Sequence, residues 1–414
     1  MHILFFSDNF PPEVNAPASR TYEHCREWVK AGHEVTVITC APNFPSGKVF
    51  EGYRNRLWHT EEIDGIRVIR VWSFIARNEG FAKRILDYLS YMITAFVASL
   101  FVRRVTIIIG TSPQFFAACA ACASAFVKRR PWIFELRDIW PESIRAVGAV
   151  KSEAVLNFFE KIELFLYRNS TAVISVTHSF KRNLIQRGVR EDKIYVITNG
   201  VDTSRFTAMP KDADLLDMLG LSGKFVAGYI GTHGMAHGLD TLLDAATILK
   251  SEGHSRIVLM LLGDGAEKAR LQARAAYEGL DNVLFVDSVP KSEIARYWSI
   301  LDVAVIHLRK SDLFQTVIPS KLFECMGMGL PILHGVEGES ADIVIRHDVG
   351  LAIAPENPAQ LVSKLVHLHS DKALRKRLSD NGPVAAERYD RSVLAMEMIE
   401  ILETVTVGAN RKAI

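Results

Sequence analysis

The sequence has little cysteine and almost no net charge. Its 414 residues include five cysteines, which are too few for a disulfide framework and fit a reducing cytoplasm. Cys119 and Cys122 have the CxxC spacing of many metal sites, but they lie in an alanine-rich apolar run, so we expect them to pack inside a helix. The 49 Lys and Arg residues nearly balance 47 Asp and Glu residues, for a net charge of +2. That balance gives no overall attraction to nucleic acid, and we expect no nucleic-acid partner.

Long hydrophobic runs are also scarce. One candidate, residues 85–102, carries a single charge at Asp87 and is short and polar for a transmembrane span. We expect a helix that packs on a sheet or lies at a membrane surface, and the basic pairs Lys83-Arg84 and Arg103-Arg104 favour the membrane surface. The start of the chain, residues 2–6, lacks the basic leader of a signal peptide and predicts a first buried strand.

Short apolar segments alternate with helical patterns along the whole chain. Because such alternation builds parallel sheets covered by helices, the predicted fold class is α/β. The length predicts two domains, and the polar stretch 205–217 marks their boundary. We therefore divide the chain into residues 1–205, residues 206–390 and a final helical segment 391–414. The predicted strands are 2–7, 34–40, 66–72, 105–111, 132–136, 172–176 and 194–197 in the first half, and 225–230, 257–262, 283–286, 303–307, 331–333 and 351–354 in the second.

The segment 319–332 carries the most specific functional pattern. Pro319 and Ser320 open a short predicted helix, and Glu324 lies one turn inside it. The start of a helix presents free amides and the positive end of a dipole, which suit a diphosphate. A carboxylate one turn further along can accept hydrogen bonds from ribose hydroxyls. The pattern therefore indicates a nucleotide site, although an ordinary capped helix would look the same.

Two glycine-rich turns follow predicted strands in the same domain. The first, residues 231–238, reads Gly-Thr-His-Gly-Met-Ala-His-Gly, and the second is Gly263-Asp264-Gly265. Glycine lets the backbone approach a phosphate closely. His233 and His237 could donate hydrogen bonds to phosphate oxygens, or they could be solvated loop residues. Because parallel strands end at one edge of a sheet, these turns and the helix after residue 319 predict one shared site.

The first half of the chain contains further candidate ligand-binding residues. The loop after the first strand contains Asn15, Ala16 and Arg20, and a later strand ends in Arg137-Asp138. Small residues in the loop would let a ligand approach, and Arg20 could reach an anion. The Arg137-Asp138 pair could face a ligand or form a structural ion pair. The loop is not a GxGxxG turn, which argues against NAD.

Together these motifs resemble the family 4 glycosyltransferases of the GT-B fold over nearly the whole chain. The resemblance rests on Pro11-Pro12 and on residues 198–202, 263–265, 289–291 and 323–331. The runs 137–142 and 231–239 are similar to a bacterial subgroup that builds O-antigen and capsule repeat units, including transferases of N-acetylfucosamine type. The family implies two Rossmann-like domains whose parallel sheets face a central cleft, with a last helix that crosses back to the first domain.

The resemblance also implies an activity. A family member transfers a sugar, with retention of anomeric configuration, from a nucleotide-diphosphate donor to an acceptor held by the first domain. It needs no cofactor and no divalent metal, because positive charge and amide dipoles stabilise the leaving diphosphate. For this chain we expect a UDP-linked N-acetylamino sugar as donor. The expected acceptor is a polyprenyl-diphosphate-linked saccharide at the cytoplasmic face of the inner membrane.

Motif position assigns roles to individual residues. Glu324 would bind the donor ribose, and the amides at Ser320, Lys321 and Leu322 would meet the diphosphate. The chain departs from the family at Thr316, where a glutamate is usual, and at Thr232 and His237, where an arginine and a lysine are usual. The expected catalytic residues are Arg137, Asp138, Lys321 and Glu324, and the expected donor-binding residues are Asn15, Ala16, Arg20, Gly231, Thr232, His233, Gly234, His237, Gly263, Asp264, Gly265, Val289, Pro290, Arg309, Thr316, Pro319, Ser320 and Leu322.

The departures define one hypothesis and leave two alternatives open. We expect Lys321, with His237 and Arg309, to supply the positive charge that the family otherwise takes from the missing pair, and Arg137-Asp138 to stand in for a first-domain histidine. One alternative is an isomerase of the same fold, similar to UDP-N-acetylglucosamine 2-epimerase. The other is a nucleotide-sugar binding protein without activity, which the replacement of charged residues by Thr232 and Thr316 would allow.

Overall fold

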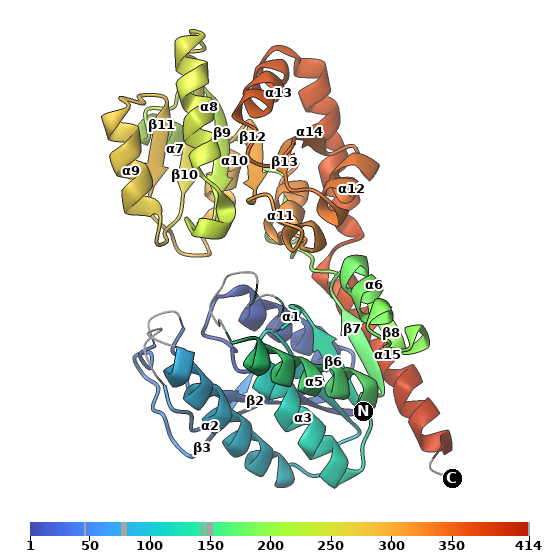
Figure 1. Cartoon of the computed structure of the whole chain (residues 1–414). Helices are drawn as coiled ribbons and strands as arrows, with labels where there is room; N and C mark the ends of the chain where they lie inside the picture. The colour runs from blue at the N-terminus through green and yellow to red at the C-terminus, as the bar shows by residue number, and fades with distance from the viewer. Residues whose placement is uncertain (45–46, 76–80, 141, 143–144, 146–151, 413–414) are drawn as a thin grey trace. The chain divides into compact units, whose positions relative to one another are not determined.

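A computed structural model describes the chain except for residues 45–46, 76–80, 141, 143–144, 146–151 and 413–414, and except for the side chains of residues 81–82 and 409–412. The described chain forms two compact units (Figure 1). Unit 1 comprises Met1–Thr198 and Arg391–Ile414, and unit 2 comprises Asn199–Asp390. The chain thus enters unit 2 seven residues before the predicted boundary at residue 205, and its final segment belongs to unit 1.

Unit 1 is built on an eight-stranded sheet with the order β3-β4-β2-β1-β5-β6-β7-β8. All neighbouring strands pair in parallel except β3 and β4, which are antiparallel. The strands are β1 His2–Phe6, β2 Glu34–Cys40, β3 Trp58–Ile63, β4 Ile66–Val71, β5 Ile107–Thr111, β6 Trp132–Leu136, β7 Ala172–Ser175 and β8 Ile194–Val196. The sequence predicted every one of these strands except β3.

Helices cover both faces of the unit 1 sheet. On one face α1 and α15 pack against Ile3 and Phe5 of β1, and on the other α2, α3, α5 and α6 pack against Leu4 and Phe6. The indole of Trp28 in α1 donates a hydrogen bond to the carbonyl of Ala395 in α15 (2.8 Å), which joins the last helix to the first. The helices are α1 Ala16–Lys30, α2 Phe81–Leu100, α3 Phe115–Lys128, α5 Glu153–Asn169, α6 His178–Gln186, the short η1 Glu191–Lys193, and α15 Arg391–Lys412.

The apolar stretch 85–102 forms most of α2, which packs on α3 and on the sheet. Tyr91, Ala95 and Ala98 are buried in this contact, and the hydroxyl of Tyr91 donates to the carbonyl of Ile38 in β2 (2.8 Å). Of the two expected placements, a helix packed on a sheet or a helix at a membrane surface, the structure confirms the packing on the sheet. Within the described residues, no helix is long and apolar enough to cross a membrane. Cys119 and Cys122 pack in α3 against the same core, as expected.

Unit 2 is built on a six-stranded parallel sheet with the order β11-β10-β9-β12-β13-β14. The strands are β9 Phe225–Ile230, β10 Ile257–Leu262, β11 Val283–Val286, β12 Val303–His307, β13 Ile332–Gly335 and β14 Gly350–Ala352. The first strand of this unit, β9, lies between β10 and β12, so the strand order reverses beside it. In open α/β sheets such a reversal leaves a crevice at the carboxyl ends of the strands, where ligands bind.

Helices also form a layer on each face of the unit 2 sheet (Figure 1). Leucines of α8, α9 and α13 pack against one face, and α10, α11 and α12 pack against the other. The helices are α7 Ala213–Met218, η2 Met235–His237, α8 Asp240–Ser251, α9 Lys268–Tyr277, α10 Ile294–Ser299, η3 Phe314–Thr316, α11 Lys321–Gly327, α12 Glu339–Arg346, α13 Pro358–Ser370 and α14 Lys372–Glu387. Two of them, α8 and α9, follow directly on the two glycine-rich turns.

Candidate functional site

The two glycine-rich turns of unit 2 are hydrogen-bonded to each other. The amide of His233 donates to the carbonyl of Asp264 (2.8 Å), and the carbonyl of His233 accepts from the amide of Glu267 (2.9 Å). Gly263 has a φ of +147°, and a Cβ there would overlap the carbonyl oxygen of Gly231. A Cβ at Gly265 would lie 2.5 Å from the carbonyl oxygen of His233. Glycine is therefore required where the two turns meet, and the hydrogen bonds between them join the turns into one unit of backbone.

Tyr229, which lies in the predicted strand 225–230 and was not among the predicted site residues, contacts several of them. The ammonium nitrogen of Lys321, at the start of α11, lies 3.9 Å from the ring centroid of Tyr229 in β9. The rings of His233 and His237 lie 6.0 and 5.8 Å from the same ring. A Cβ on Gly231 would lie 2.5 Å from the Lys321 Nζ. The structure thus brings together residues predicted from two separate motifs, the turn 231–238 and the segment 319–332.

The charge of Lys321 is not paired within the part of the chain that the structure describes. Among the described residues, no carboxylate lies within ion-pair distance of its ammonium group, although Glu324 and Cys325 lie near enough to act on it. Burial lowers the pKa of Lys321 to about 8, against the opposing effect of these two residues. An ammonium that is held without a counter-ion in a partly buried site is positioned to bind an anion.

The two histidines are neutral near pH 7. Burial, followed by the charges of Lys268 and Lys321, lowers the pKa of His233 to about 4. Burial, followed by the charge of Lys321, lowers the pKa of His237 to about 4 as well. Both ring nitrogens of His233 and Nδ1 of His237 are buried without a hydrogen-bond partner of normal geometry among the described residues. Buried polar atoms of this kind usually have a partner, so these nitrogens have the capacity to bond a ligand.

The helix α11 presents Glu324 on its first turn. One oxygen of this carboxylate accepts a hydrogen bond from the indole of Trp298 (3.3 Å). The amide of Leu322 donates to the carbonyl of Pro319 (3.0 Å), so it is already engaged in the turn that opens the helix. The hydroxyl of Thr316 likewise donates within its own turn, to the carbonyl of Leu313 (2.6 Å).

The other predicted donor-site residues of unit 2 line the same loops. The amide of Arg309 donates to the carbonyl of Ala236 (2.9 Å), and its side chain is exposed. The carboxylate of Asp264 accepts from the amide of Gly265 (2.8 Å). The carbonyl of Thr232 accepts from the Tyr229 hydroxyl, that of Ser320 from the amide of Phe323, and that of Gly234 from the amide of His237. Val289 packs against the core, and Pro290 is exposed.

Two further side chains hold this site and were missed in the sequence. The ammonium of Lys268, at the start of α9, donates to the carbonyl of Gly263 (2.8 Å). The ring of His307, at the end of β12, bonds the carbonyl of His237 through Nδ1 (2.7 Å) and accepts the amide of Glu356 at Nε2 (3.0 Å). Neither residue lies in a motif: Lys268 follows the second turn by three positions, and His307 is brought beside the first turn by the folding of the sheet.

In unit 1, Arg20 has a different position from the one expected. Its side chain is buried, with Nε bonded to Glu135 (3.0 Å) and its other nitrogens bonded to the carbonyls of Ile197 (3.0 Å) and Thr198 (2.6 Å). Burial would raise the pKa of Glu135, but the charges of Arg20 and Arg137 hold it below its usual value. Arg20 therefore forms an internal ion pair and ties strand ends together, instead of presenting its charge to an anion.

Arg137 and its neighbours fix the start of α1. The guanidinium of Arg137 donates to the carbonyls of Pro17 (3.2 Å) and Ala16 (3.1 Å), and the side chain of Asn15 caps the helix by accepting the amide of Ala18 (2.9 Å). Burial lowers the pKa of Arg137 to about 10. The backbone amide of Asp138 donates to the Ser112 hydroxyl (3.2 Å). The run 137–142 that carried part of the family resemblance includes Pro141, which lies outside the described residues.

The side chains that most often bind metal ions in proteins are His, Cys, Asp and Glu. Across the part of the chain that the structure describes, no group of three or more His, Cys, Asp or Glu side chains is arranged to hold a metal ion.

Each of the two units matches a known family of proteins. Residues 18–205 match the family model described as Glycosyltransferase Family 4, and residues 219–384 match the model described as Glycosyl transferases group 1. Relatives include the putative colanic acid biosynthesis glycosyl transferase WcaI of Escherichia coli K12, 27% identical over 80% of this chain and 82% of the relative. The amylovoran biosynthesis glycosyltransferase AmsK of Erwinia amylovora is 26% identical over 58% of this chain and 57% of the relative.

Solved structures with low sequence identity share this fold along nearly the full chain. Sucrose-phosphate synthase from Thermosynechococcus elongatus superposes with a TM-score of 0.76 at 17% identity, covering 98% of this chain and 99% of that one. Anabaena HepE in complex with UDP-glucose gives a TM-score of 0.72 at 17% identity, over 98% and 100% of the two chains. The lipopolysaccharide glycosyltransferase WaaG gives 0.69 at 14% identity, over 97% and 99%. The chain therefore belongs to the family 4 glycosyltransferases and has their GT-B fold of two Rossmann-like domains.

Proposed function

We propose that this enzyme transfers a sugar, with retention of configuration, from a nucleotide-diphosphate donor to a lipid-linked saccharide during synthesis of a bacterial surface polysaccharide. The observation that carries the donor part is the ammonium of Lys321, which lies over Tyr229 and beside Gly231 and has no carboxylate partner among the described residues. A diphosphate supplies the counter-charge that this ammonium lacks. The names of WcaI and AmsK, which refer to colanic acid and amylovoran, support a polysaccharide product.

The leaving group is where this site can act chemically. As the glycosidic bond to the donor breaks, negative charge builds up on the diphosphate, and Lys321 would stabilise that charge more strongly in the transition state than in the ground state. The amides of Ser320 and Lys321 open α11 and would reinforce it. His233 and His237 would donate hydrogen bonds as neutral rings. We propose that these groups suffice without a divalent metal.

The donor's nucleoside would lie beside the same helix. The carboxylate of Glu324, oriented by Trp298, would accept hydrogen bonds from the ribose hydroxyls, and the turn 263–265 with Val289 and Pro290 would line the base. UDP is the proposed carrier, because the similar GT-B structure of HepE was solved with UDP-glucose. A UDP-N-acetylamino sugar remains our proposal for the donor itself.

The test uses the purified full chain and a panel of nucleotide sugars. A donor should raise the unfolding temperature, because a ligand at a hundredfold excess over its Kd stabilises by about 2.7 kcal/mol. Lys321→Ala should lower kcat/KM at least about a hundredfold, because one preorganised charge-stabilising group contributes about 3 kcal/mol. Lys376→Ala is the matched control, since the Lys376 side chain is 76% exposed and forms a surface ion pair with Asp380.

Each outcome of this test has a defined meaning. Transfer that survives EDTA and gives a retained anomer in the NMR spectrum supports the proposal. Epimerised donor in the absence of acceptor would indicate an isomerase instead, and tight donor binding without turnover on any acceptor would indicate a binding protein. Unchanged turnover by Lys321→Ala would remove Lys321 from the mechanism.

We also propose that unit 1 contacts an anionic membrane that carries the acceptor. Two helix ends carry the same pattern of a phenylalanine, a valine and basic residues. Phe101-Val102-Arg103-Arg104 directly follows α2, and Phe126-Val127-Lys128-Arg129-Arg130 spans the end of α3. The ammonium of Lys128 donates to the carbonyl of Val102 (2.8 Å), which holds the two ends together. Phe101 and Phe126 are 70% and 85% exposed. Exposed aromatic rings within a basic cluster suit the interface of an anionic bilayer.

This surface can be tested without any acceptor. Vesicles containing phosphatidylglycerol should pull down the wild-type chain at low salt, and vesicles of phosphatidylcholine alone should not. The double variant Phe101→Ser and Phe126→Ser should lose most of this binding, whereas Tyr277→Ser, which changes a 93% exposed ring of unit 2, should not. Equal binding by all three proteins would remove this surface from the proposal.

A further inference from the structure

Lys321 is held by an aromatic ring where a carboxylate would be the usual partner. Its Nζ lies 3.9 Å from the ring centroid of Tyr229, well inside the distance at which a cation and a ring face attract each other. The Tyr229 ring is fully buried, and its hydroxyl donates to the carbonyl of Thr232 (2.8 Å). The ring is therefore fixed at two points, by the sheet at its base and by the turn at its tip.

Titratable groups surround this pair on every side. His233 and His237 approach from the turn after β9, Glu324 and Cys325 act on Lys321 from its own helix, and Lys268 acts on His233 from α9. Among the described residues, Glu324 is the one carboxylate that acts on Lys321, and it lies beyond ion-pair distance. The ring face of Tyr229, by contrast, is in direct contact with the ammonium.

The choice of partner has a chemical consequence. A carboxylate would hold the ammonium in place, but it would also neutralise the charge and compete with a phosphate for the N–H donors. A ring face attracts the cation through its quadrupole and carries no net charge. It leaves the lysine hydrogens that point away from the ring free to bond an oxygen anion.

We infer that Tyr229 is a positioning residue, whose ring face holds the Lys321 ammonium beside Gly231 so that its charge stays available to the donor's diphosphate. The inference rests on the proposed function for the identity of the anion. Its geometric part, the contact between ring and ammonium, does not. The ring and the hydroxyl have separate tasks, because the hydroxyl contacts Thr232 and the face contacts Lys321.

These two tasks can be separated by substitution. Tyr229→Phe keeps the ring and loses only the hydroxyl, so it should retain donor affinity and kcat within about threefold of the wild type. Tyr229→Leu loses the ring, and it should weaken donor binding at least about tenfold, within the range expected for a desolvated cation–ring contact. Because leucine also leaves a void, a loss in this variant alone would not distinguish positioning from packing.

A fluorinated series makes that distinction. Phenylalanine with one, two and three ring fluorines, incorporated at position 229, changes the ring's shape little but weakens the negative potential of its face in steps. We expect UDP affinity, measured by calorimetry, to fall in the same steps. We also expect the pKa of Lys321, read from the chemical shift of its 13Cε carbon in the protein without ligand, to fall in steps. A packing role would move neither quantity.

The two readouts separate failure of this inference from failure of the proposed function. If neither the pKa of Lys321 nor the affinity for UDP changes across the fluorinated variants, the positioning role of Tyr229 is overturned, even if the enzyme transfers sugar. A stepwise NMR titration in a protein that binds no nucleotide keeps the ring–ammonium contact but overturns the assignment of the diphosphate as its anion. Lys376, titrated in the same spectra, serves as the exposed lysine whose pKa should not change.

Discussion

At the scale of single residues, the ionisation of Lys321 sets a limit on the pH at which the enzyme can bind its donor. The ammonium is charged below its pKa, which burial lowers to about 8, and only the charged form can pair with a phosphate. We predict that kcat/KM for the donor falls by a single titration as the pH rises through about 8. The fall in kcat should occur at a higher pH than the fall in kcat/KM, because a bound diphosphate favours the charged form of Lys321 and so raises its pKa. A profile that stays flat up to pH 10 would contradict this role.

A second prediction at this scale concerns Gly263. Alanine there would place a Cβ against the carbonyl oxygen of Gly231 at a φ of +147°, so the backbone must move. We predict that Gly263→Ala lowers the free energy of unfolding by at least about 2 kcal/mol more than Gly253→Ala. Gly253 is the matched control because it has a φ of +78° with open space around it. Urea denaturation of both variants measures the difference, and equal values would mean that the turns are not in close contact.

Some residues of the site could be predicted from the sequence, and others could not. Lys321, His233, His237 and Gly231 were each predicted from the residue types that bind phosphates, and the structure places them together. Tyr229 was missed because a tyrosine in an apolar strand looks like any core residue, and one sequence does not reveal which ring meets a lysine 92 positions later. Arg20 was expected to meet an anion, since nothing local shows that Glu135 is buried beside it.

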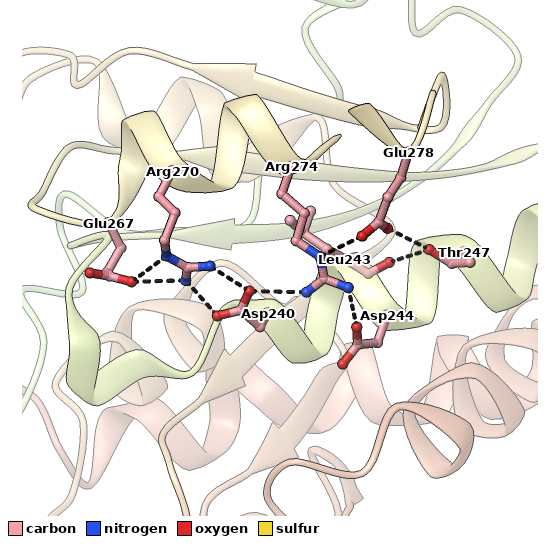
Figure 2. A network of polar contacts seen from close by, with 8 residues as sticks. All are labelled: Asp240, Leu243, Asp244, Thr247, Glu267, Arg270, Arg274 and Glu278. Atoms are coloured by element: carbon pink, nitrogen blue, oxygen red, sulfur yellow. Dashed lines mark hydrogen bonds and ion pairs between the residues drawn. The ribbon is translucent and has the colours of Figure 1, made fainter. Parts of the chain in front are cut away.

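At the scale of elements, a network of ion pairs holds α8 against α9, and so holds the two glycine-rich turns that precede them (Figure 2). Arg270 bonds both oxygens of Asp240 (3.0 and 2.6 Å), at the start of α8, and also Glu267 (2.8 Å), which directly precedes α9. Arg274 bonds Asp240 (3.0 Å) and, one turn further along, Asp244 and Glu278. The Arg270 contacts thus join the residues that immediately follow each turn.

We predict that Arg270→Ala raises the donor KM about three- to tenfold but lowers the free energy of unfolding by only about 1 kcal/mol. The stability effect is small because exposed ion pairs contribute about 0.2–1 kcal/mol each. The effect on KM follows if the spacing of the turns positions the donor. Arg274→Ala is the control, because its bonds lie further from the turns, and its KM should change less. Steady-state kinetics at low and high salt test this, and an equal rise in both variants would argue against a specific role for Arg270.

The elements themselves were largely predictable. Buried parallel strands such as β9 and β10 are continuous apolar runs, and their bounds followed directly from the sequence. The edge strand β3 was missed because Trp58–Ile63 alternates exposed and half-buried residues and contains His59, Glu61 and Glu62, so it looks like a polar loop. What makes this segment a strand is its antiparallel pairing with β4, and the pattern of residues within the segment does not reveal that pairing.

At the scale of the whole molecule, the last helix belongs to the unit that is distant from it in sequence. Arg391 of α15 forms an ion pair with Glu23 of α1, and the apolar face of α15 fills the core on the α1 side of the unit 1 sheet. Helical spacing after residue 391 was visible in the sequence, but which sheet the helix covers was given only by the family resemblance. The division of the chain into units therefore depends on contacts between its two ends.

This arrangement predicts that a change in α15 destabilises unit 1 and leaves unit 2 intact. Leu402 is fully buried in the core between α15 and the sheet, and Leu402→Ala should lower the free energy of unfolding of unit 1 by about 2–5 kcal/mol through the cavity it leaves. Hydrogen exchange should then quicken in β1 and α1, about 400 positions earlier in the chain, but not in β9 or β10. Val407→Ala, at a 54% exposed side chain of the same helix, should change neither unit. Faster exchange in β9 with Leu402→Ala would mean that the two units unfold together, and that residues 391–414 stabilise the whole chain rather than unit 1 alone.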